Sequence, residues 1–120
     1  MEWNKRKLGS EKEQMVCEYL IQHGYEILEC NYQVRCGEID IIAKEQEYLV
    51  FIEVKYRRFA TSGYAAEAVN YRKIRKIGRV VLFYLNAHAI PDNQAIRFDV
   101  VAVDGDRIEV IKNAFEYMGH

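Results

Sequence analysis

The chain has 120 residues, of which 50% are hydrophobic and 29% are charged, with one proline and a formal net charge of −1. This length and composition predict a single ordered domain over residues 1–120, and they exclude a multidomain enzyme, a collagen-like chain and a disordered tail. No apolar run approaches the ~18–20 residues of a membrane-spanning helix, and the N-terminus has no signal-peptide pattern. We therefore expect a cytoplasmic protein with no membrane partner.

The charge is unevenly distributed along the chain. Residues 55–79 hold eight basic residues and one acidic residue, a net charge of +7, which leaves −8 for the remainder. Such asymmetry is typical of a protein with one face for a polyphosphate partner, but a solvated helix face gives the same pattern. The basic residues are Lys55, Arg57, Arg58, Arg72, Lys73, Arg75, Lys76 and Arg79.

The first predicted element is a helix that follows a loose arm over residues 1–8. Ser10 and Glu13 have the spacing of a capping box, in which each side chain accepts a hydrogen bond from the backbone of the other. Apolar residues then recur at helical spacing until Gly24, a residue suited to a left-handed helix stop. The pattern predicts a helix over 11–23.

Three strands are predicted after this helix. Residues 25–32 alternate between apolar and polar side chains, which favours a strand. The β-branched runs 37–44 and 48–56 are separated by the polar residues 45–47, which is the pattern of a hairpin.

A second helix and a second hairpin complete the chain. Asn70 is a suitable cap for a helix that runs to about His88, because apolar residues recur at helical spacing from Ile74. The runs 96–103 and 107–114 flank a polar turn. The predicted order is α-β-β-β-α-β-β, an α/β (α+β) fold with two helices flanking a mixed sheet.

The three cysteines are Cys17, Cys30 and Cys36, and they lack the spacing of a zinc site or a disulfide framework. We expect reduced thiols, two of them buried.

Charged residues gather on one face of the first predicted hairpin. With a two-residue turn at 46–47, Asp40 lies directly opposite Glu53, and Lys55 lies opposite Glu38. We expect Glu38 to pair with Lys55. The other face is uniformly apolar and is predicted to be core, with Ile39, Ile41, Ala43, Val50, Ile52 and Val54.

Two carboxylates facing each other across a ribbon repel, and folding gains nothing from that arrangement unless a cation or a proton lies between them. Mg²⁺ or Mn²⁺ would resolve the conflict, since Asp40 and Glu53 can each supply an oxygen, with a backbone carbonyl and waters completing the coordination. Lys55 points to the same face, where an ammonium can position a water or neutralise a phosphate. This combination predicts phosphodiester hydrolysis, although an accidental salt-bridge cluster remains the alternative interpretation.

The spacing of Asp40 and Glu53-Val54-Lys55 resembles the PD-(D/E)xK nuclease superfamily, whose core has the order αβββαβ. The runs 37–43, 50–55 and 97–101, with Asn31-Tyr32, are similar to the YraN family of uncharacterised bacterial proteins. This resemblance covers nearly the whole chain and implies a restriction-endonuclease-like fold, close to archaeal Holliday-junction resolvases. It also implies that Asp40 and Glu53 bind metal, that Lys55 is the catalytic lysine and that Glu13 is a further acidic member of the site.

Two departures from these patterns bear on the site. Ile39 stands where the superfamily has the proline of its name, and Lys12 stands where the family usually has glycine. Because Glu13 also fits a capping box, its role stays open between capping and catalysis.

The leading expectation is a Mg²⁺- or Mn²⁺-dependent endonuclease that cleaves DNA, either branched or single-stranded. Phosphate contacts are expected from Arg57, Arg58, Arg72, Lys73, Lys76 and Arg79. The alternatives are a non-catalytic nucleic-acid-binding module that acts through a partner, and an interaction domain with neither property. A homodimer that places two sites across a branched substrate is an arrangement that the small size makes attractive.

Overall fold

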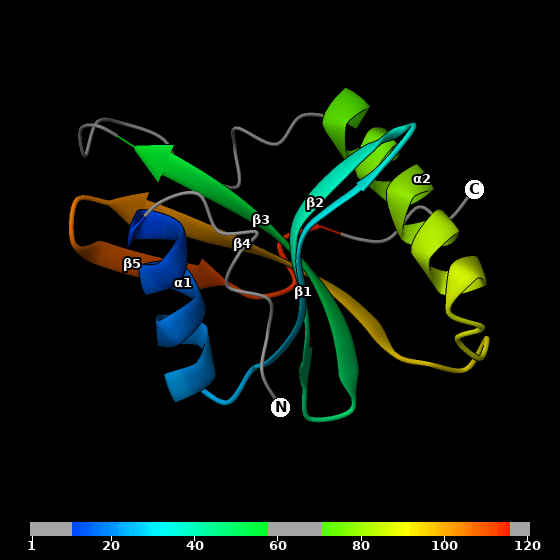
Figure 1. Cartoon of the computed structure of the whole chain (residues 1–120), viewed down its shortest axis with the longest axis horizontal. Helices are drawn as coiled ribbons and strands as arrows, with labels where there is room; N and C mark the ends of the chain where they lie inside the picture. Colours follow the sequence, from blue (N-terminus) through cyan, green and yellow to red (C-terminus); the bar gives the residue numbers. More distant parts are fainter. Residues whose placement is uncertain (1–10, 58–70, 116–120) are drawn as a thin grey trace.

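The computed structural model describes residues 11–57 and 71–115, without the side chains of Arg57, Tyr71 and Arg72. Its elements are α1 (Glu11–Gln22), β1 (Glu26–Val34), β2 (Gly37–Glu45), β3 (Tyr48–Arg57), α2 (Tyr71–Ala87), β4 (Ile96–Asp104) and β5 (Arg107–Ile111) (Figure 1). This is the predicted order. The predicted arm over residues 1–8 and the predicted cap Ser10 lie outside the described residues.

The five strands form one sheet in the order β1-β2-β3-β4-β5. Neighbouring strands are antiparallel except for β3 and β4, which are parallel and are connected through α2. The mixed sheet with two helices confirms the predicted α+β arrangement. Strand β5 ends at Ile111, earlier than predicted, because Asn113 adopts a positive φ of 55° and its backbone N–H donates to Asp99.

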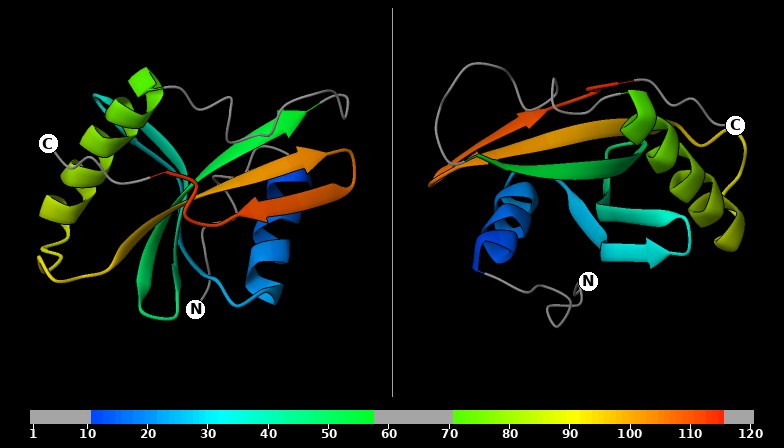
Figure 2. Two further views of the ribbon diagram at one scale, coloured as in Figure 1. Left: turned by 180° about the vertical axis from the view of Figure 1, so that it is seen from behind. Right: turned by 90° about the horizontal axis from the view of Figure 1, so that it is seen from above.

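The helices cover opposite faces of the sheet and lie toward opposite ends of it (Figures 1 and 2). Alternate residues of β3 enter two separate hydrophobic clusters. Val50 and Ile52 pack with residues of α1, while Leu49 and Phe51 pack with residues of α2. Neither described helix is long and apolar enough to cross a membrane.

The β2–β3 hairpin has the predicted register. Pairing runs from Glu45 with Tyr48 to Ile41 with Ile52, and Gln46 takes the positive φ of 56° that a tight two-residue turn requires. The sequence therefore predicted correctly which residues of the two strands share a face near the turn.

Beyond Ile41 the side chains of β2 do not keep the predicted alternation between the two faces of the sheet. Ile41 packs in the α1 cluster, but Ile39 packs in the α2 cluster with Ile42. Asn31 of β1 has a positive φ of 53°, and the register of β1 against β2 shifts between Ile27 and Glu29. The prediction that Ile39 and Ile41 share one face is therefore wrong, since the two side chains join the hydrophobic clusters of different helices.

A charged network is buried on the α1 face of the sheet. Asp99 is 0% exposed, and its two carboxylate oxygens accept hydrogen bonds from Arg97 Nε at 2.9 Å and Nη2 at 2.8 Å. Tyr25 donates a third hydrogen bond at 2.7 Å. Arg97 also pairs with Glu45 at 2.6 Å, and Glu45 pairs with Lys112 at 2.7 Å.

The prediction that two of the three cysteines are buried is confirmed. Cys17 of α1 and Cys30 of β1 are buried free thiols, with their Sγ atoms 3.7 Å apart, and Cys36 is a half-buried free thiol. Their contact helps to hold α1 against β1.

Candidate functional site

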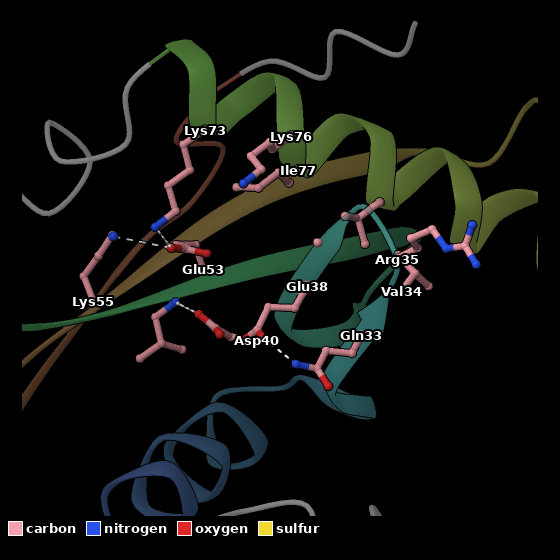
Figure 3. A pocket seen from close by; sticks show the side chains of 13 residues that line it. Gln33, Val34, Arg35, Glu38, Asp40, Glu53, Lys55, Lys73, Lys76 and Ile77 are labelled. Carbon is pink, nitrogen blue, oxygen red and sulfur yellow. Dashed lines mark hydrogen bonds and ion pairs between the residues drawn. The ribbon is translucent and has the colours of Figure 1, made fainter.

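A cavity of about 810 Å³ lies between β2, β3, the β1–β2 turn and α2 (Figure 3). The three residues predicted to share a site, Asp40, Glu53 and Lys55, all line it. Two lysines of α2, Lys73 and Lys76, line it from the opposite side. The sheet supplies the carboxylates of this cavity, and the sheet and the helix both supply cations.

Asp40 lies where β2 leaves β3, and its side chain fills the gap between the two strands. Asp40 does not pair with Glu53 in the strand ladder. Its Oδ2 atom accepts a hydrogen bond from the backbone N–H of Val54 at 2.8 Å. Burial raises the pKa of Asp40 to about 6, the Val54 hydrogen bond partly opposes this rise, and the charges of Glu53 and Glu38 add to it. The predicted repulsion between Asp40 and Glu53 is therefore present, but without the predicted pairing of the two residues in the strand ladder.

Glu53 of β3 is held by two ammonium groups. Lys73 reaches down from α2 to form a direct ion pair with Glu53 Oε2, and Lys55 Nζ lies 3.4 Å from the same oxygen (Figure 3). The Glu53 side chain is only 12% exposed. The predicted pairing of Lys55 with Glu38 is wrong, since Lys55 pairs with Glu53. Glu38 accepts a hydrogen bond from Gln33 Nε2 at 3.0 Å.

The pKa values of the two lysines around Glu53 are shifted in opposite directions. Hydrogen bonding to Lys73 and burial lower the pKa of Lys55, against the attraction of Glu53. Burial disfavours the charge of Lys73, but its hydrogen bonds to Glu53 and Lys55 outweigh that cost and raise its pKa. Lys73 is therefore the more firmly charged partner of Glu53, and Lys55 is the lysine whose proton is more easily removed.

Glu13 of α1 approaches Asp40 from the other face of the sheet. It lines a smaller cavity of about 70 Å³ together with Cys17, Tyr56 and Asp40. Asp40 borders both cavities, whereas Glu13 and Glu53 each border one of them. Glu13 is thus close to the candidate site without sharing the cavity of Glu53, and both predicted roles stay open.

The structure brings only some of the predicted phosphate-binding residues to the cavity. Lys73 and Lys76 line it, while Arg79 is exposed on α2 and does not. Arg58 and the side chains of Arg57 and Arg72 lie outside the described residues.

Sequence reasoning missed two features of the cavity. Lys73 was expected to contact phosphate, but here it pairs with Glu53. Arg35 of the β1–β2 turn, which was not predicted to be functional, lines the cavity at its far end. The irregular segment around Arg35 has no periodicity from which its orientation could be read.

The donor set fits a hard divalent cation. Two carboxylates that repel each other face one cavity, and Glu53 already attracts two cationic side chains. In residues 11–57 and 71–115 no group of three or more His, Cys, Asp and Glu side chains is arranged to hold a metal. An ion at Asp40 and Glu53 would therefore take two side-chain ligands and complete its shell with backbone oxygens and waters, as Mg²⁺ commonly does.

The comparisons with known proteins identify the family. The model of the uncharacterised protein family UPF0102 matches residues 12–103. A UPF0102 protein of Lachnoclostridium phytofermentans is 44% identical over 97% of this chain and 98% of its own length. UPF0102 proteins of Fusobacterium nucleatum and Syntrophus aciditrophicus are 44% and 49% identical, each over 92% of this chain and over 92% and 87% of their own lengths. The resemblance to YraN proteins is confirmed, and the chain belongs to the UPF0102 family.

Proposed function

We propose that this protein is a Mg²⁺- or Mn²⁺-dependent nuclease that hydrolyses phosphodiester bonds in DNA. The observation that carries the proposal is the convergence of Asp40, Glu53 and Lys55 on one cavity, where burial raises the pKa of Asp40 and the charge of Glu53 adds to the rise. The spacing of these residues and the αβββαβ order are those of PD-(D/E)xK nucleases, which supports the same chemistry.

Each residue of the cavity has a role in this proposal. Asp40 and Glu53 would hold the divalent ion, which supplies a water of lowered pKa and a Lewis acid for the phosphate. Lys55, with its lowered pKa, is suited to accept a proton from that water or to hold it in place. Lys73, which stays charged, is suited to bind a phosphate oxygen when an ion replaces it at Glu53.

The cations beside the carboxylates support a nucleic-acid substrate. Lys76 shares the cavity, and Arg79 continues the basic surface of α2 into solvent. Contacts of this kind give affinity for phosphates without sequence preference.

The test is cleavage of labelled branched, single-stranded and duplex DNA by purified protein with Mn²⁺. Glu53→Gln and Lys55→Met should each lose at least about 100-fold in rate, the size expected when a group that stabilises transition-state charge is removed. Glu109→Gln and Lys44→Met are matched controls on exposed positions of the sheet and should cleave like the wild type. Equal cleavage by all five proteins would mean a contaminating nuclease and would defeat the proposal.

One observation favours a second candidate, a nucleic-acid-binding module without catalysis. Glu53 has two ammonium partners in the protein itself, so its charge is compensated without a metal ion. This candidate predicts DNA binding that weakens steeply with salt, with no cleavage and no divalent-metal binding at Asp40 and Glu53.

A further inference from the structure

The two lysines that contact Glu53 come from different elements of the fold. Lys55 lies on β3, two residues beyond Glu53, whereas Lys73 reaches across the cavity from α2 (Figure 3). Both ammonium groups lie against the same carboxylate oxygen, Oε2, and the contact of Lys73 is the closer of the two. One of the two oxygens that Glu53 could offer to a divalent ion is therefore in contact with an ammonium group from the helix.

Lys73 also acts on the second carboxylate of the candidate site. Asp40, Glu53 and Lys73 all line one cavity. Burial raises the pKa of Asp40, and the positive charge of Lys73 is one of the effects that oppose this rise. One positive charge is thus attracted by Asp40 and by Glu53, as a bound divalent ion would be.

The attachment of each lysine decides which of the two can leave Glu53. Lys55 and Glu53 project from one strand, two positions apart, and therefore stay on the same side of the sheet. Lys73 is joined to α2 by a flexible four-carbon chain, and its side chain is 37% exposed. Its ammonium group can therefore move from Glu53 into solvent at a small cost.

We propose that Lys73 is a built-in competitor of the divalent ion: it holds Glu53 in the metal-free protein, and an ion enters the site by displacing it. The inference rests on the proposed function for the assignment of Asp40 and Glu53 as metal ligands, and it adds how the access of the ion to Glu53 is controlled. The competitor gives the mostly buried Glu53 carboxylate a counter-charge when no ion is bound. Removal of the Lys73 charge should therefore strengthen metal binding, although Lys73 lines the candidate site.

The experiment measures metal binding in the absence of nucleic acid. Mn²⁺ is titrated by calorimetry into the wild type, Lys73→Met and Lys73→Arg at pH 7.5. Methionine removes the charge, whereas arginine keeps a positive charge that can pair with Glu53. Lys76→Met is the matched control, because Lys76 lines the same cavity from the same helix. Among the described residues, the ion pairs of Glu53 are those with Lys55 and Lys73.

Lys73→Met should bind Mn²⁺ about two- to fivefold more tightly than the wild type, since the contact that the ion displaces is a partly exposed ion pair. Lys73→Arg should bind Mn²⁺ no more tightly than the wild type, because the competing charge is retained. Lys76→Met should gain less affinity than Lys73→Met, because it removes only a longer-range repulsion of the ion, which salt screens.

The inference is overturned if Lys73→Met binds Mn²⁺ with the wild-type affinity, or if Lys76→Met or Lys73→Arg gains as much affinity as Lys73→Met. These results are separable from the fate of the proposed function. Loss of cleavage in Glu53→Gln, with equal Mn²⁺ affinity of Lys73→Met and the wild type, would retain the nuclease and remove the competition. Tighter Mn²⁺ binding by Lys73→Met in a protein that cleaves no DNA would do the reverse.

Discussion

Two clusters of acidic and basic side chains lie on opposite faces of the same sheet, and they differ in how their carboxylates are compensated. On the α1 face, Arg97 lies between Glu45 and Asp99 and donates to both. On the α2 face, Asp40 and Glu53 face one cavity, where burial raises the pKa of Asp40 and the charge of Glu53 adds to the rise. The first arrangement compensates both buried carboxylates within the fold, and the second leaves a repulsion that folding alone does not reward.

The pKa directions express the same contrast. Burial disfavours the charge of Glu45, but hydrogen bonds from Lys112 and Arg97 outweigh it and lower its pKa. Asp40 is shifted upward, to about 6, because a single backbone hydrogen bond does not offset its burial and its acidic neighbours. A buried acidic residue whose charge is poorly compensated marks a candidate site for a cation.

The largest expected effect is on the α1 face, for Asp99→Asn. The amide would place donors against Arg97, Tyr25 or the Asn113 backbone and leave the buried guanidinium short of negative charge. We expect the free energy of unfolding, measured by urea titration, to fall by about 3–5 kcal/mol. Glu109→Gln, on an exposed position, is the control. A loss below about 1 kcal/mol for Asp99→Asn would remove the distinction between the clusters.

For Asp40→Asn we expect the free energy of unfolding to rise at neutral pH, the opposite of the change expected for Asp99→Asn. The pKa of Asp40 rises from 3.8 to about 6 on folding, so the native protein binds a proton more tightly than the unfolded chain. The contribution of Asp40 to stability therefore decreases as the pH rises from about 4 to 6. In metal-free buffer at pH 7.5, Asp40→Asn should be more stable than the wild type by about 1–3 kcal/mol, because Asn still accepts from Val54. The gain in stability should disappear near pH 4. An equal difference in the free energy of unfolding between Asp40→Asn and the wild type at pH 4 and at pH 7.5 would contradict this account.

The smallest effect is expected for Lys73→Met. The Lys73 side chain is 37% exposed, so its ion pair with Glu53 is partly screened by solvent. We expect a loss of about 0.5–1 kcal/mol in low salt, measured by urea titration, and a smaller loss in high salt. Lys44→Met, at an exposed position of β2, gives the baseline for the substitution itself. A loss as large as that of Asp99→Asn would place Lys73 among the structural residues instead.

The element order and the register of the first hairpin could be predicted because local patterns determine them. Alternation along β2 and β3 and the length of the turn define which residues pair, and the pairs from Ile41–Ile52 to Glu45–Tyr48 follow. Asp40, Glu53 and Lys55 line one cavity as predicted, although Asp40 lies beyond the last pair of this register.

The remaining features of the site depend on tertiary packing, which local patterns do not contain. The change of faces between Ile41 and Ile39 is one such feature, since the two side chains join different hydrophobic clusters although they are two positions apart on one strand. The contact of Lys73 with Glu53 depends on where α2 lies over the sheet, and the position of Arg35 depends on how the β1–β2 turn meets that helix. Such contacts join residues far apart in the chain or in irregular segments, where periodicity gives no direction.

The most direct test of the central claim is calorimetric titration of Mn²⁺ into the wild type and Asp40→Asn at pH 7.5, where the Asp40 carboxyl is ionised. The account predicts a binding heat for the wild type and for Glu109→Gln, and an affinity at least about tenfold weaker for Asp40→Asn. A wild type that gives no heat, or an Asp40→Asn variant that binds Mn²⁺ as tightly as the wild type, would contradict the assignment of Asp40 and Glu53 as a metal site.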